Sequence, residues 1–147
     1  MAKGHVAKAE IEINASKENV WHALTDPEMI KQYLFGTTVT TDWKVGSPIT
    51  YQGEWEGKKY EDKGKILEFE KEKKIVSTYW SSMSGIEDKP ENYMTVTHEV
   101  SEHKGKTKVT ITQDNNADEE SAKHSQQNWA MVLGKMKELL ESKILRK

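Results

Sequence analysis

Residues 118–143 read DEESAKHSQQNWAMVLGKMKELLESK and carry the longest helical pattern in the chain. The apolar side chains recur at alternating steps of four and three residues, which places them on one face of an α-helix. That face comprises Ala122, Gln126, Trp129, Leu133, Met136, Leu140 and Ile144, widened by Val132 and Leu139. Acidic residues crowd the start of the stretch and basic residues crowd its end, as the helix dipole favours. The pattern predicts an amphipathic helix roughly 40 Å long.

The opposite face of this predicted helix is polar, with Lys123, Gln127, Lys137 and Glu141. A helix with one apolar face must pack that face against another element, and one this long needs a broad partner surface. Gly134 lies in the middle of the helix, where glycine costs about 1 kcal/mol relative to alanine. It either lets the helix bend or approach the sheet closely, or it is a neutral surface residue.

The start of the chain predicts one strand and two short helices. Apolar residues alternate with polar ones over residues 8–14, as in a half-buried strand. Ser16 then occupies an N-cap position before a first helix. Asp26 and Pro27 begin a second helix, with a cap and a proline in the first turn. Gly36 is suited to end that helix.

Between residues 37 and 112 the pattern changes to a period of two, which is typical of strands. Turn residues divide this part into about six strands: a short one near 37–41, then 49–55, 59–70, 75–80, 93–100 and 107–112. Sequential strands joined by short turns usually pair as neighbours, so we expect an antiparallel meander with one buried face. The sequence therefore predicts an α+β fold in the order β-α-α-β6-α, with a curved antiparallel sheet wrapped around the long C-terminal helix.

Composition favours a soluble, cytoplasmic protein of one domain. The chain has 147 residues, enough to bury one core, and no boundary divides residues 1–147. It contains no cysteine, which excludes disulfides and thiolate metal sites. No apolar run resembles a signal peptide or approaches the ~20 residues of a membrane span. The net charge of −2 comes from interspersed acids and bases, so we expect no nucleic acid partner.

The five histidines show no spacing that would gather metal ligands. They are His5, His22, His98, His103 and His124. We expect them to be structural or solvated, and we expect neither a metal nor another cofactor.

Two pairs of acids deserve a comparison with catalytic carboxylates. Glu54 and Glu56 flank one aromatic residue, and Glu68 and Glu70 flank another. A spacing of two places each pair on one face of a strand, where two carboxylates can share acid–base work. The simpler interpretation is that these acids point to water. The sequence also lacks nucleophile-elbow and phosphate-loop motifs, so we expect no catalytic residues.

The aromatic residues are the most informative functional signal. A plain core would be served by leucine and isoleucine, whereas tryptophan and tyrosine carry a polar group that needs a partner. We therefore predict a cavity between the sheet and the long helix. Its predicted ligand-binding residues are Phe35, Trp43, Tyr51, Trp55, Trp80, Met83, Tyr93, Trp129, Leu133 and Met136. We expect Trp129 and either Tyr51 or Trp55 to face the ligand, with Tyr93 and Phe35 near the mouth. The alternative is a space filled by the protein's own side chains.

Six segments, in this order, carry a resemblance to a known family. They are INASKENVWHALTDPE at 13–28, TDWKVGSP at 41–48, GKILEF at 64–69, PENY at 90–93, VTITQDN at 109–115 and NWAMVLGKMKELLE at 128–141. With them the chain resembles the domain shared by the C-terminal half of the activator of the Hsp90 ATPase and many small bacterial proteins. This domain belongs to the START-like superfamily. The resemblance implies the helix-grip (Bet v 1-like) fold, in which sheet and long helix enclose an apolar cavity.

The members of that superfamily include lipid binders, plant-hormone binders, polyketide cyclases and chaperone regulators, so three functions remain open. We favour non-enzymatic binding of a small apolar molecule (a lipid, polyketide or flavonoid-like compound), with a role in stress response. The second is a chaperone-associated interaction domain of the Hsp90 type, and the third is a cyclase-like enzyme. We expect a monomer without membrane insertion. Polar residues with perturbed pKa values inside the cavity would favour the enzyme.

Overall fold

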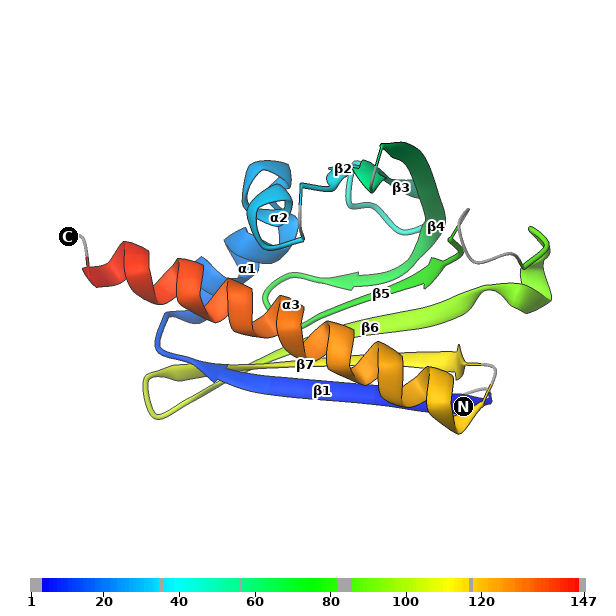
Figure 1. Cartoon of the computed structure of the whole chain (residues 1–147). Helices are drawn as coiled ribbons and strands as arrows, with labels where there is room; N and C mark the ends of the chain where they lie inside the picture. Colours follow the sequence, from blue (N-terminus) through cyan, green and yellow to red (C-terminus); the bar gives the residue numbers. More distant parts are fainter. Residues whose placement is uncertain (1–3, 35, 56, 82–85, 117, 146–147) are drawn as a thin grey trace.

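Seven strands form one antiparallel sheet within the part of the chain that the structure describes, and a long helix crosses its concave face (Figure 1). The structure is a computed structural model that describes residues 4–34, 36–55, 57–81, 86–116 and 118–145; the side chains of 55 and 142–145 lie outside this description. The elements are β1 (His5–Ile13), α1 (Lys17–Thr25), α2 (Pro27–Tyr33), β2 (Thr38–Thr40), β3 (Pro48–Trp55), β4 (Lys58–Glu70), β5 (Lys74–Tyr79), the 3₁₀ turn η1 (Pro90–Asn92), β6 (Met94–His103), β7 (Lys106–Asn116) and α3 (Glu119–Leu145).

The strands follow one another across the sheet in the order β1-β7-β6-β5-β4-β3-β2. Strands β2 to β7 are thus a meander in which each strand pairs with its neighbour in sequence, as predicted. The first strand joins at the far edge by pairing with the last one, with Ile11 opposite Val109. The α+β helix-grip fold is therefore confirmed. Within the described residues, no helix combines the length and the apolar character needed to cross a membrane.

The two short helices begin where their capping residues predict. The Ser16 Oγ accepts a hydrogen bond from the Asn19 N–H (3.1 Å) at the start of α1. The Asp26 Oδ1 accepts one from the Glu28 N–H (3.1 Å), with Pro27 in the first turn of α2. Each cap satisfies a backbone donor that the helix itself leaves unpaired. These caps set where α1 and α2 begin.

An irregularity in β4 lets the sheet turn a second apolar residue into the core. The pairing of β4 with β5 shifts between Ile66 and Glu68, as at a β-bulge. Because the side chains of a regular strand alternate, Ile66 and Phe69 would otherwise face opposite sides. With the shift, Ile66 is fully buried and Phe69 packs edge-to-face on Trp21 of α1, with ring centroids 5.4 Å apart. Leu67 is left exposed.

The long helix buries the face that its period predicts, with one exception. Ala122, Val132, Leu133, Met136 and Leu140 are buried, and Trp129 and Leu139 are partly buried. Gln126 was predicted on this face but is exposed, so that assignment was wrong. Ser125 is partly buried in its place, because at this turn the protein-facing side of α3 runs from Ala122 through Ser125 to Trp129. Ile144 lies outside the described side chains.

The helix lies over only part of the sheet. It packs mainly against β1 and more lightly against β7, while α1 and α2 cover the end nearest the C-terminus (Figure 1). Two polar contacts fix its C-terminal half to the end of β1. The Glu141 Oε2 accepts a hydrogen bond from the Asn14 N–H, and the Lys137 Nζ donates one to the Glu12 carbonyl, both at 2.9 Å. The sheet curves away from the helix toward β2 and β3.

Candidate ligand-binding site

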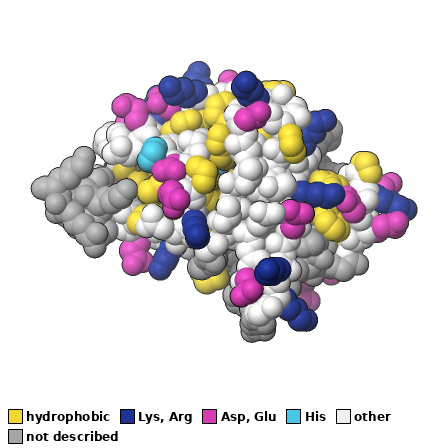
Figure 2. Space-filling model, turned by 90° about the horizontal axis from the view of Figure 1, so that it is seen from above, with side chains coloured by type: hydrophobic (Ala, Val, Ile, Leu, Met, Phe, Trp, Pro, Cys, Tyr) yellow, Lys and Arg dark blue, Asp and Glu magenta, His cyan; other side chains and the backbone are white. Residues whose placement is uncertain are grey.

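A cavity of about 760 Å³ lies between the concave face of the sheet, α2 and the N-terminal half of α3, and it is open to solvent on one side. Most of its lining surface is apolar, from residues such as Ile49, Ile75, Val96, Ile111 and Met136. Figure 2 looks down from the side of α2 and β2, where hydrophobic side chains gather between charged ones. The volume is in the range of small-molecule sites, which run from about 300 to 1,000 Å³.

Strand alternation explains which side chains reach this cavity. Every second residue of a strand points to the same face, so polar residues in phase with buried apolar ones are carried inward. The polar residues placed in this way are Tyr51 on β3, Tyr60 and Asp62 on β4, Ser77 and Tyr79 on β5, His98 on β6 and Gln113 on β7. Ser125 and Trp129 reach the cavity from α3.

One wall of the cavity is a hydrogen-bonded network centred on Gln113. Its side-chain oxygen accepts a hydrogen bond from the Trp129 indole N–H (2.8 Å), which fixes that ring against the sheet. Its Nε2 lies 3.3 Å from both the Asn116 Oδ1 and the Ser125 Oγ, and 2.9 Å from the Met94 sulfur. The Gln113 amide is therefore satisfied on both sides, and its role is to hold Trp129 at the cavity.

The opposite wall carries a buried carboxylate and two tyrosines. The Tyr79 hydroxyl donates a hydrogen bond to the Asp62 Oδ2 (2.7 Å), and the Tyr51 and Tyr79 rings meet edge-to-face with centroids 5.6 Å apart. Burial, followed by the hydrogen bond to Asp62, raises the pKa of the Tyr79 hydroxyl far above its usual value. Burial also raises the pKa of Tyr51 to about 12, although its hydrogen bond with Ser77 acts in the opposite direction. Both hydroxyls are protonated at neutral pH.

A third polar contact closes the cavity beside β2. The hydroxyl groups of Thr37 and Tyr60 lie 2.6 Å apart in a hydrogen bond. Gly53 stands opposite Tyr60 on the neighbouring strand, and a Cβ atom there would overlap the Tyr60 ring. The missing side chain of Gly53 thus gives the Tyr60 ring its space.

His98 brings into the cavity wall a buried nitrogen that makes no hydrogen bond with the described residues. It lines the cavity from β6, and its ring meets the Trp129 ring edge-to-face at 5.9 Å. Its Nδ1 is completely buried and has no hydrogen-bond partner among the described residues. Burial lowers the pKa of the imidazole to about 4, because desolvation penalises the charged form. The ring is therefore neutral at physiological pH.

Four of the ten residues predicted to bind a ligand line this cavity: Trp43, Tyr51, Trp129 and Met136. Leu133 does not line it, and its side chain, which is 1% exposed, packs inside the core. Phe35, Met83 and the side chain of Trp55 lie outside the described residues.

Trp80 and Tyr93 form a separate aromatic pair, away from the cavity lining. Their rings stack with centroids 6.5 Å apart, the Trp80 Nε1–H donates to the Ile86 carbonyl (3.0 Å), and the Tyr93 hydroxyl donates to Asp88 (2.7 Å). Trp80 follows Tyr79 directly, so the alternation of side chains along a strand places Trp80 on the face of the sheet opposite to Tyr79 and the cavity. Tyr93 therefore does not stand at the mouth of the cavity.

Seven of the polar cavity residues named above were not predicted from the sequence: Tyr60, Asp62, Ser77, Tyr79, His98, Gln113 and Ser125. Those on the strands were not predicted because a polar residue within a strand is most simply assigned to the solvent face. Their position in the alternation of each strand could have identified them, because it is that of buried apolar residues. His98 shares its phase with Val96 and Val100, and Gln113 shares its phase with Ile111.

The geometry gives no support to acid–base catalysis by the two pairs of glutamates or to a metal site among the described residues. Glu68 and Glu70 both pair with Lys74 on the outside of the sheet, at 3.2 and 3.8 Å, and Glu54 is exposed at the cavity rim. Glu56 is outside the described residues. Within the described part of the chain, no three His, Cys, Asp or Glu side chains come together as a metal site would require.

Comparison with known proteins places the chain in a family. The model of the family described as Activator of Hsp90 ATPase homolog 1-like protein matches residues 14–141. The solution structure of ChR145 from Cytophaga hutchinsonii is 46% identical to this chain, with a TM-score of 0.84, over 98% of this chain and 99% of that one. No curated protein matches the sequence.

Two more distant structures share the fold. The Aha1 dimer from Colwellia psychrerythraea is 20% identical, with a TM-score of 0.71 over 93% of this chain and 96% of that one. DynU16, a protein in the dynemicin biosynthetic locus, is 14% identical, with a TM-score of 0.78 over 92% of this chain and 47% of that one. Since the family model covers all but the ends of the chain, the protein belongs to the family of Activator of Hsp90 ATPase homolog 1-like proteins.

Proposed function

We propose that the protein binds a small, largely apolar molecule in the cavity between the sheet and α3, without catalysing a reaction on it. The observation that carries this proposal is the 760 Å³ space itself, which is lined mainly by apolar and aromatic side chains with a few polar groups between them. Sites for small molecules have this character. The alternative of a space filled by the protein's own side chains would leave only small voids between close-packed atoms.

The cavity does contain polar residues with perturbed pKa values, which is the feature expected of an enzyme, but the direction of these shifts fits binding better than acid–base catalysis. A general acid or base works best at neutral pH when its pKa lies near 7. In this cavity burial moves the pKa values away from 7, upward for Tyr51 and Tyr79 and downward for His98. The three side chains are thus neutral hydrogen-bonding groups, suited to fixing the orientation of a ligand. Ligand binding is therefore better supported than cyclase-like catalysis.

The proposal includes three further expectations about the protein as a whole. Residues 1–147 act as one domain, the protein is a monomer, and it works in the cytoplasm, where a chain without cysteine needs no oxidising environment. Light scattering on the purified protein tests whether it is a monomer, because a monomer has the mass of 16.9 kDa given by the sequence.

Extraction and titration test the proposed binding. Mass spectrometry of an organic extract of the purified protein should reveal a bound apolar compound when one is retained. A panel of lipids, polyketides and flavonoid-like compounds should quench tryptophan emission saturably for at least one class, because Trp43 and Trp129 line the cavity. Burial of apolar area offsets the cost of association well enough for micromolar affinity. A panel without any saturable binder would contradict the proposal.

Family membership favours one second candidate, association with a chaperone of the Hsp90 type. In that function the outer surface would form the contact and the cavity would be secondary. Purified chaperone and protein can be mixed and separated by size-exclusion chromatography, with the ATPase rate of the chaperone measured in parallel. Co-migration together with a changed ATPase rate would support this candidate, and separate migration would count against it.

A further inference from the structure

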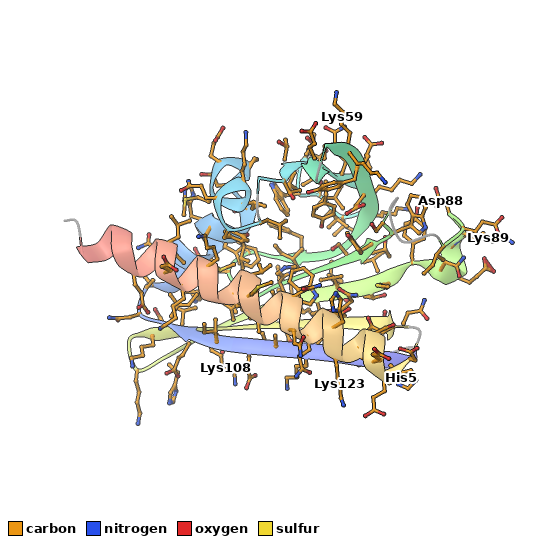
Figure 3. All side chains as sticks on the ribbon, viewed as in Figure 1. His5, Lys59, Asp88, Lys89, Lys108 and Lys123 are labelled. Atoms are coloured by element: carbon orange, nitrogen blue, oxygen red, sulfur yellow. The ribbon has the colours of Figure 1, made fainter. Side chains whose placement is uncertain are left out.

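The cavity lining contains acids but no base of the lysine or arginine type among the described residues. Asp62 is 8% exposed on the β4 wall, and Glu54 lies at the rim. The lysines labelled in Figure 3, such as Lys59, Lys108 and Lys123, point away from the space between α3 and strands β2 and β3. A carboxylate or phosphate brought into this space would lose its hydration without gaining a cationic partner, and Asp62 would repel it. The lining thus disfavours anionic ligands.

The tautomer of His98 follows from the burial of one ring nitrogen. A neutral imidazole carries one proton, on either Nδ1 or Nε2. A proton on Nδ1 would be a completely buried donor without an acceptor, and such orphan N–H groups are rare in native proteins. The proton therefore belongs on Nε2. No hydrogen bond engages Nε2 within the described residues, so it is free to donate toward the cavity that the ring lines.

Two other donors of the cavity lining are already used. The Trp129 indole N–H is held by Gln113, and the Tyr79 hydroxyl is held by Asp62. The His98 Nε2–H differs from these two, because it has no acceptor among the residues that the structure describes. The edges and faces of the Trp129, Tyr51 and Tyr79 rings surround the same space, which favours a flat aromatic partner.

We propose that the cavity selects uncharged aromatic molecules that carry a carbonyl-type hydrogen-bond acceptor, which accepts the proton of the His98 Nε2, and that it discriminates against carboxylates. This inference rests on the proposed function, because it names the ligand chemistry of the same cavity. It separates flat aromatic ketones from fatty acids, two classes that an apolar cavity alone would not distinguish.

Three compounds with one tricyclic ring system test this selectivity: fluorene, 9-fluorenone and fluorene-9-carboxylate. They share their apolar surface and differ in a carbonyl acceptor or a negative charge. Isothermal titration calorimetry at pH 7.5 should show 9-fluorenone binding about tenfold more tightly than fluorene, as expected for one hydrogen bond to a buried donor. Fluorene-9-carboxylate should bind at least about tenfold more weakly than 9-fluorenone.

Two variants assign the preference to one residue. His98→Phe keeps a flat ring but removes the donor, so the preference for 9-fluorenone over fluorene should disappear while fluorene still binds. His103→Phe changes an exposed histidine of the same strand, β6, outside the cavity lining, and should keep the preference. In the unchanged protein, ¹⁵N spectra of the imidazole should show the proton on Nε2 at pH 7, which gives a readout that does not depend on the folding of a variant.

The outcomes separate this inference from the function on which it rests. If fluorene binds but the ketone has no advantage, if the carboxylate binds as tightly as the ketone, or if His98 is protonated on Nδ1, the selectivity proposed here is wrong and the cavity is still a binding site. If none of the three compounds binds, the proposed function fails together with the inference.

Discussion

Replacing Trp129 by alanine should weaken ligand binding about tenfold and should lower stability no more than a core truncation on the same helix does. The indole lines the cavity, donates a hydrogen bond to Gln113 (2.8 Å) and meets the His98 ring at 5.9 Å. The matched change is Leu133→Ala, one helical turn further along α3, where the side chain is 1% exposed and outside the cavity lining. The two positions lie on the same helix, and they differ in whether the side chain meets a ligand or the core.

The structure gives the size of each effect. At Trp129 the lost contributions are one hydrogen bond of about 1 kcal/mol and one ring contact of about 1 kcal/mol, so the free energy of unfolding should fall by about 2 kcal/mol. At Leu133 a buried leucine is replaced by a cavity, which costs roughly 2–5 kcal/mol. A ligand that loses about 60 Å² of apolar contact with the indole loses about 1.5 kcal/mol, or about tenfold in affinity. Leu133→Ala should leave the affinity nearly unchanged.

Urea unfolding measures the stabilities, and isothermal titration calorimetry measures the affinities without depending on the tryptophan that is removed. The ligand is the tightest compound found in the titration panel. The reasoning is refuted if Leu133→Ala weakens binding more than Trp129→Ala does. It is also refuted if Trp129→Ala costs several kcal/mol of stability while binding persists, since Trp129 would then be a core residue.

Two further changes follow from the backbone and from His98. Gly134→Ala should stabilise the protein by up to about 1 kcal/mol, because no atom of another element lies within 4 Å of the added methyl group. Gly64→Ala should destabilise it by roughly 1–3 kcal/mol, because its Cβ would overlap the Thr78 carbonyl. Urea unfolding that ranks the two variants in the opposite order would contradict this. Between pH 6.5 and about 4 the unfolded chain protonates His98 while the folded chain does not, so the free energy of unfolding should fall as the pH drops, by up to about 3 kcal/mol. His98→Phe should lose that part of the pH dependence, and an unchanged pH profile in urea unfolding would show that His98 is not buried neutral.

The sequence predicted the elements and their order well, because each has a local physical signal. Ser16 and Asp26 mark helix starts through their caps, and both caps are formed. The period of the C-terminal segment predicted α3, although Gln126 turned out to be exposed. Gly134 does not serve a close approach to the sheet, since no atom of another element lies within 4 Å of a Cβ at this position. Short turns between successive strands predicted the meander.

The composition of the cavity was less predictable, because it depends on how the curved sheet and the helix separate. Trp129 and Tyr51 were found through their size and chemistry, but Leu133 has the same helical phase as Trp129 and lies in the core. Asp62 and His98 were missed because polar residues in strands were assigned to solvent. Polar side chains in phase with the core break the usual pattern, and such exceptions are expected at functional sites.

The most direct test of a ligand in this cavity is the ¹H–¹⁵N spectrum of the tryptophan indole groups during titration with the compound panel. The protein has five tryptophans, of which Trp43 and Trp129 line the cavity, Trp21 packs against Phe69, and Trp80 stacks on Tyr93. For at least one uncharged apolar compound, the Trp43 and Trp129 signals should shift saturably, while those of Trp21 and Trp80 stay in place. Shifts confined to Trp80, or no saturable shift with any compound, would contradict binding in the cavity.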